Sequence, residues 1–115
     1  MEASGKFPVI KENHLFLKIY GKGKSHVSDA LAVYVLKNYD KRSTLVGFTV
    51  SKNRGNAVTR NRIRRRIREA YRILYPFITK GYLIVIVARQ SCINYSSAEL
   101  CEQLHAILRK AALFS

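Results

Sequence analysis

Long apolar segments are absent from this sequence of 115 residues. The two longest uninterrupted apolar runs, 30–36 and 82–88, have seven residues each, whereas a helix needs about 20 to cross a bilayer. Residues 1–8 also lack the apolar stretch of a secretory signal. We therefore expect a cytoplasmic protein that has no contact with a membrane.

Cysteine is scarce, with Cys92 and Cys101 as its two occurrences. A chain of this length buries enough surface to fold without a disulfide, so we expect both thiols to be reduced. The three histidines are scattered and share no metal-ligand spacing with the cysteines. We therefore expect no metal site on the protein.

Acidic residues are also few, because 7 Asp and Glu stand against 21 Lys and Arg, which gives a formal net charge of +14. No pair of carboxylates suggests a two-metal nuclease site, and no motif of nucleophilic catalysis is present. We therefore expect no catalytic residue in this chain. So high a charge opposes folding through self-repulsion and indicates a polyanionic partner.

The positive charge is concentrated in one part of the chain. Residues 51–80 carry ten basic residues and one acidic residue, whereas 81–115 have a net charge of +1. Seven arginines and no lysine occupy 60–72. Guanidinium groups bind phosphate in a bidentate manner and stack on bases, which ammonium groups do not do. Composition therefore favours a nucleic acid as the partner.

The apolar pattern predicts the order α-β-β-β-α-β-α. Three helices are expected: one from an Asn13 cap to about Gly21, one over 57–75 with Asn56 as cap, and one after a Ser96/Glu99 capping box. Strands are expected at 25–28, 30–36, 45–50 and 82–88. We expect 30–36 and 45–50 to form an antiparallel hairpin, and 82–88 to be covered on both faces. This is an α+β fold, a small α/β sandwich. One domain over 10–115 would follow a flexible segment, 1–9.

A helical wheel divides 57–75 into two faces. The apolar side must face the sheet and consists of Ile63, Ile67, Ala70 and Leu74; the polar side consists of Asn61, Arg64, Arg65, Arg68 and Arg72. Like charges repeat at every i+4 step from Arg60 to Arg72, which disfavours a merely solvated face. Pro76 ends the helix without a heptad repeat, which disfavours a basic zipper on DNA. A rigid arginine face on a compact domain suits folded RNA.

The segment 46–71 closely resembles the signature of the bacterial ribonuclease P protein subunit. The family's pattern is a lysine, then Gly-x-Ala-Val-x-Arg-Asn-Arg/Lys-x-Lys/Arg-Arg-x-x-Arg-Glu/Gln. Lys52 and residues 55–69 meet every position of it. The resemblance extends to the expected first helix, the strands around Tyr34 and 82–88, and the closing helix.

The resemblance implies a protein that assists a catalytic RNA in cutting the 5′ leader from precursor tRNA, while the RNA performs the hydrolysis with bound Mg²⁺. It also implies a left-handed β-α-β crossover around the basic helix. The family's RNA-binding residues map onto Lys52, Arg54, Arg60, Asn61, Arg62, Arg64, Arg65 and Arg68, and its leader cleft onto Phe16, Tyr20, Tyr34 and Arg89. We expect a monomer when free and one protein per RNA.

Two alternatives stay open at this point. Phe16 and Tyr20, spaced i,i+4 on an amphipathic helix, also fit an ordinary core position. A leader cleft is physically reasonable because aromatic rings stack on bases with little sequence demand. The alternative function is a basic structural ribosomal protein, which would need arginines but not this loop-and-helix pattern.

Overall fold

The computed structural model describes residues 7–114. Within them the elements follow in the order α1 (Asn13–Lys22), β1 (Lys24–Val27), β2 (Leu31–Lys37), β3 (Leu45–Thr49), η1 (Lys52–Arg54), α2 (Ala57–Leu74), η2 (Tyr75–Phe77), β4 (Tyr82–Ala88), η3 (Gln90–Asn94) and α3 (Ser97–Lys110). The predicted order of helices and strands is confirmed. No helix in the described part of the chain is long and apolar enough to span a membrane.

The four strands form one sheet in the order β1-β2-β4-β3. β4 pairs antiparallel with β2 and parallel with β3. The predicted hairpin between 30–36 and 45–50 is therefore wrong, because β4 lies between these two strands. The physical reason is that β4 is apolar on both faces and belongs at the centre of the sheet, where both faces are covered.

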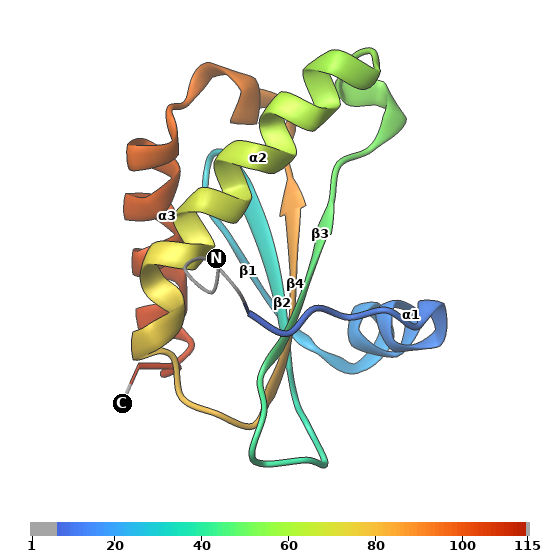
Figure 1. The fold of residues 1–115 in the computed structure, drawn as a ribbon, viewed down its shortest axis with the longest axis vertical. Coiled ribbons are helices and arrows are strands. Elements are labelled where there is room, and N and C mark those ends of the chain that lie inside the picture. Colours follow the sequence, from blue (N-terminus) through green and yellow to red (C-terminus); the bar gives the residue numbers. More distant parts are fainter. Residues whose placement is uncertain (1–6, 115) are drawn as a thin grey trace.

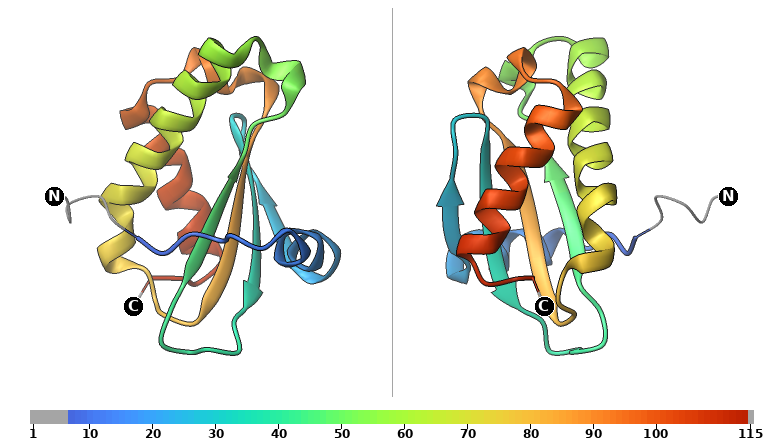
Figure 2. Two further views of the ribbon diagram at one scale, coloured as in Figure 1. Left: turned by 45° about the vertical axis from the view of Figure 1, so that its right-hand side comes forward. Right: turned by 90° about the vertical axis from the view of Figure 1, so that its left-hand side faces the viewer.

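The connection from β3 through α2 to β4 is a β-α-β crossover. Seen from the helix side with both strands pointing up, β4 lies to the left of β3 (Figure 2, right). The crossover is therefore left-handed, as the family resemblance implied. About 98% of such connections are right-handed, so this handedness is a specific feature of the fold.

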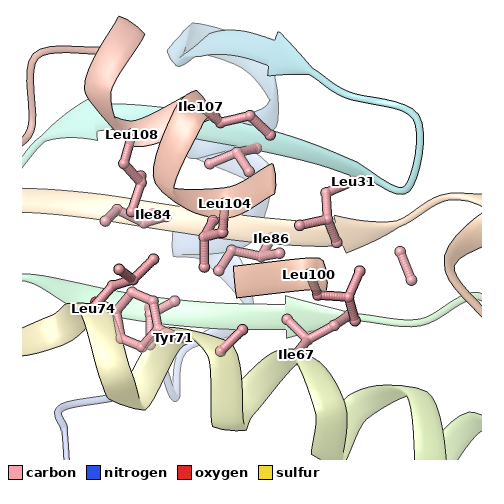
Figure 3. Close-up of a cluster of buried hydrophobic side chains, with 14 of the residues drawn as sticks. Leu31, Ile67, Tyr71, Leu74, Ile84, Ile86, Leu100, Leu104, Ile107 and Leu108 are labelled. Atoms are coloured by element: carbon pink, nitrogen blue, oxygen red, sulfur yellow. The ribbon is translucent and has the colours of Figure 1, made fainter. Parts of the chain in front are cut away.

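The sheet separates two apolar clusters. α2 and α3 cover one face, and α1 lies against the other (Figure 1). Figure 3 shows Leu104 of α3 beside Ile86 of β4, and Leu100 of α3 beside Ile67 of α2. On the opposite face, Val85 of β4 packs in the smaller cluster with Ile19 of α1. Alternate residues of β4 thus join both clusters.

Side-chain caps define where two of the helices begin. The Asn56 side chain accepts a hydrogen bond from Thr59 N–H at 2.9 Å, and Ser96 and Glu99 form the predicted capping box of α3. The predicted cap of α1, Asn13, is wrong by one residue. Glu12 occupies the cap position without a side-chain bond, and Asn13 is the first helical residue.

Residues 7–10 lie beside β3. Val46 N–H donates to the Pro8 carbonyl at 3.2 Å, and Ile10 N–H donates to the Val46 carbonyl at 2.9 Å. This pairing differs from the flexible segment predicted up to residue 9. The rest of that predicted segment, 1–6, lies outside the described residues.

Candidate nucleic-acid interface

The apolar side of α2 is buried as the wheel predicts. Ile63, Ile67, Ala70 and Leu74 all face the core, and Tyr71 is buried beside them. This packing turns the opposite side of the helix outward. Asn61, Arg62, Arg65 and Arg68 are exposed there, while Arg60 and Arg64 are half-buried.

The outward side of α2 borders a groove of about 480 Å³, which we call the arginine groove. Its lining residues are Phe7, Asn61, Arg64, Arg65, Arg68, Glu69 and Arg72. Arg64 donates a hydrogen bond to the Asn61 side-chain oxygen at 3.1 Å, so these two lining residues contact each other. Four guanidinium groups around one recess make a strongly positive site with many N–H donors, suited to phosphate.

Besides Arg64, two further arginines of α2 have hydrogen-bond partners within the protein. Arg66 donates to the carbonyls of Ile93 and Tyr95, at 3.0 and 3.1 Å, and so joins α2 to the segment before α3. Arg72 donates to Glu69 at 3.0 Å, and this bond lowers the pKa of the Glu69 carboxyl. Neither arginine belongs to the predicted RNA-binding set.

The loop between β3 and α2 holds the two other predicted basic residues. Lys52 is exposed at the start of η1, close in sequence to the α2 N-terminus. Arg54 is half-buried, and its Nε donates to the Ala88 carbonyl at 3.3 Å. Gly55 has φ +132°, a conformation that favours glycine, and turns the chain into α2. Arg54 thus fixes the loop against the end of β4.

Two of the predicted leader-cleft residues line a hollow between α1 and β3, which we call the aromatic hollow. Phe16 and Tyr20 border it, together with Phe48, Thr49 and Arg64, and its volume is about 380 Å³. The Tyr20 hydroxyl hydrogen-bonds to Thr49 Oγ1 at 2.8 Å, which fixes one side. Tyr20 remains 37% exposed, so its ring is accessible.

Tyr34 and Arg89 lie apart from the lining of the aromatic hollow. Tyr34 packs behind it, edge-on to Tyr20 with ring centroids 5.0 Å apart. Arg89 is exposed after β4, and its Nη1 donates to the Ser28 carbonyl at 2.6 Å. Of the four predicted cleft residues, the structure therefore brings Phe16, Tyr20 and Tyr34 together and leaves Arg89 elsewhere.

Sequence reasoning missed two aromatic residues at this interface. Phe7 lines the arginine groove, and Phe48 lines the aromatic hollow. Phe48 carried a weak signal, because it is the one aromatic residue in the strand that leads into the basic loop. Phe7 carried none, since it precedes the first predicted element.

Comparison with known proteins gives a consistent result. The family model described as Ribonuclease P matches residues 6–112. The Ribonuclease P protein component of Symbiobacterium thermophilum is 38% identical over 104 residues, 90% of each chain. That of Staphylococcus epidermidis is 39% identical over 107 residues, 92% of this chain and 91% of the relative.

Solved structures agree with this match. The Staphylococcus aureus RNase P protein superposes with a TM-score of 0.84 and 34% identity, covering 96% of this chain and all of that one. The Thermotoga maritima protein gives a TM-score of 0.79 at 26% identity, covering 89% and 96%. The family model, the curated relatives and the solved structures all match over most of the chain. The chain therefore belongs to the ribonuclease P protein family and not to a family of ribosomal proteins.

Proposed function

We propose that this chain is the RNA-binding subunit of ribonuclease P, an endoribonuclease, and that it assists the catalytic RNA in removing the 5′ leader from precursor tRNA. The observation that carries the proposal is the place of Arg64. This side chain borders both the arginine groove and the aromatic hollow. A phosphate-binding surface and a base-stacking surface are therefore neighbours on one side of the molecule.

The arginine groove is the part that would bind the catalytic RNA. Arg65 and Arg68 are exposed, and within residues 7–114 neither makes a hydrogen bond or ion pair with the protein. Their donors are free for phosphate oxygens, and salt dependence is the expected signature of such contacts. Asn61, Arg60 and Arg62 extend this surface along α2, and Lys52 and Arg54 extend it into the loop.

The aromatic hollow is the part that would bind the leader. A single-stranded leader has bases that are free to stack, and stacking on a ring contributes about 1–3 kcal/mol per base. Phe16 and Tyr20 offer rings there, with Tyr34 supporting Tyr20 from behind. Stacking tolerates any base, which suits leaders whose sequences differ.

The chemistry is assigned to the RNA in this proposal. Within residues 7–114, no three His, Cys, Asp or Glu side chains gather in a way that could hold a metal ion. In this proposal Mg²⁺ binds mainly to the RNA, whose phosphate oxygens are ligands that this ion prefers. The protein would act as a monomer, one per RNA, in the cytoplasm.

A cleavage assay tests the proposed function. A bacterial ribonuclease P RNA is given precursor tRNA at low Mg²⁺, with and without this protein. We expect the protein to raise cleavage, Arg65→Ala to raise it less, and purified protein alone to cleave nothing. Arg109→Ala is the matched control, because Arg109 is an exposed arginine on α3 away from the groove. Cleavage by RNA-free protein, or equal activity of the two variants, would contradict the proposal.

A binding assay tests the leader site separately. Phe16→Ala should weaken the affinity of the holoenzyme for precursor tRNA by about 1–3 kcal/mol, while affinity for mature tRNA stays unchanged. Thermal melting must accompany the measurement, because removing a core Phe costs about 3–5 kcal/mol of stability. Equal weakening of both tRNA forms, together with a large drop in melting temperature, would mean that Phe16 is an ordinary core residue.

A further inference from the structure

The guanidinium group of Arg68 lies against two neighbouring aromatic rings. Its guanidinium carbon lies 5.2 Å from the centroid of Phe7 and 5.3 Å from that of Phe48. A guanidinium within about 6 Å of a ring centroid is attracted to the ring face. Because the rings accept no conventional hydrogen bond, the N–H groups of Arg68 keep their capacity to donate.

Phe7 is itself fixed in place. Its ring meets Tyr71 edge-on with centroids 4.8 Å apart, and it also packs near Phe48 at 6.0 Å. Tyr71 is fully buried in the core. The backbone next to Phe7 is tied to β3 through Pro8 and Val46. The ring is therefore a rigid wall of the arginine groove, although it comes from the N-terminal segment.

We propose that Phe7 is a positioning residue for RNA binding. Its ring, with that of Phe48, holds the Arg68 guanidinium at the edge of the arginine groove, where Asn61 and Arg65 also lie. A long arginine side chain loses conformational freedom when it binds phosphate. Holding it beforehand reduces that loss, which strengthens binding. This inference rests on the proposed function, since it concerns the same RNA surface.

The experiment is a double-mutant cycle on the affinity for a bacterial ribonuclease P RNA. Phe7→Leu keeps an apolar side chain against Tyr71 but removes the ring face over which Arg68 lies. We expect Phe7→Leu to weaken binding about two- to fivefold, the equivalent of an exposed cation–π contact. Phe7→Tyr keeps the ring and should bind like the wild type. In the Arg68→Ala background, Phe7→Leu should have no further effect.

Controls separate positioning from stability. Phe77→Leu changes an exposed aromatic residue on η2, outside the arginine groove, and should leave affinity unchanged. Thermal melting of each variant shows whether it is folded at the assay temperature. If Phe7→Leu is unfolded there, Phe7→Met provides a flexible apolar side chain without a ring and should show the same two- to fivefold loss.

Three outcomes would overturn a claim, and they are distinguishable. An equal effect of Phe7→Leu with and without Arg68 would show that Phe7 does not act through Arg68. Unchanged affinity in folded Phe7→Leu or Phe7→Met, while Arg65→Ala weakens binding, would overturn the positioning role alone. Unchanged affinity in both Arg65→Ala and Arg68→Ala would overturn the proposed function itself.

Discussion

The ring of Phe16 occupies space that is open because residue 47 is glycine. A Cβ atom built on Gly47 would lie 2.5 Å from both Cε1 and Cζ of Phe16. Carbon atoms in contact normally lie about 3.5–4.0 Å apart. Gly47 sits in β3 opposite Val85, in extended backbone that alanine also adopts. In Gly47→Ala, the ring must therefore move by about 1 Å or more.

The expected cost of Gly47→Ala is that of an overpacked core, about 1–3 kcal/mol. With an unfolding entropy of about 2.1 cal/mol/K per residue, a chain of this size should lose about 4–12 °C in melting temperature. The displaced ring also leaves the aromatic hollow. Affinity for precursor tRNA should fall by up to the stacking contribution of about 1–3 kcal/mol, while affinity for mature tRNA should not change.

Circular dichroism melting and tRNA binding by the holoenzyme measure the two effects. Phe16→Leu, which lacks the far ring atoms, is the background that isolates the clash. In that background Gly47→Ala should cost little stability, and leader affinity should stay low. An equal loss of melting temperature in both backgrounds would refute the reasoning, since the added methyl group would then be clashing with something other than the ring.

Three further predictions concern stability. Arg66→Ala removes a donor from two backbone carbonyls and should lower the melting temperature by the equivalent of about 1 kcal/mol per bond, with a smaller loss of RNA affinity than Arg65→Ala. Tyr71→Phe removes a buried hydroxyl that has no partner within residues 7–114 and should maintain or raise the melting temperature. The hydrogen bond from Tyr95 lowers the pKa of Asp29 below 3.8, so its contribution to stability is present above pH 3.8 and is lost as the pH falls further. When the pH is lowered through this range, the melting temperature of Tyr95→Phe should therefore fall less than that of the wild type.

Local structure could be predicted well from the sequence, whereas strand pairing could not. The apolar periodicity of α2 depends on neighbouring residues, so the wheel gave its buried side correctly. The hairpin prediction was wrong because strand order depends on distant residues. Nothing in 30–50 indicates that 82–88 will insert between the two strands. The left-handed crossover was implied by the family resemblance alone.

The candidate site shows the same limit. A helical wheel shows which way Arg68 points, but it cannot show that Phe7 and Phe48 lie under its guanidinium. Likewise, the wheel leaves Arg66 off the polar side that holds Arg65, but it cannot show that Arg66 donates to the carbonyls of Ile93 and Tyr95. In each case the partner is remote in sequence, so tertiary structure decides the role of the arginine.

The central place of β4 affects how the chain acquires its shape during synthesis. β1, β2 and β3 are all made before β4, yet within residues 7–114 β3 pairs with no strand other than β4, apart from the single bridge between Val9 and Val46. Pairings between segments far apart in sequence form slowly, because a long loop must close first. A nascent chain that ends before residue 88 therefore carries all the arginines of α2 without the finished sheet that supports them. The proposed RNA-binding surface is therefore expected to be completed late, when the last strand enters the middle of the sheet.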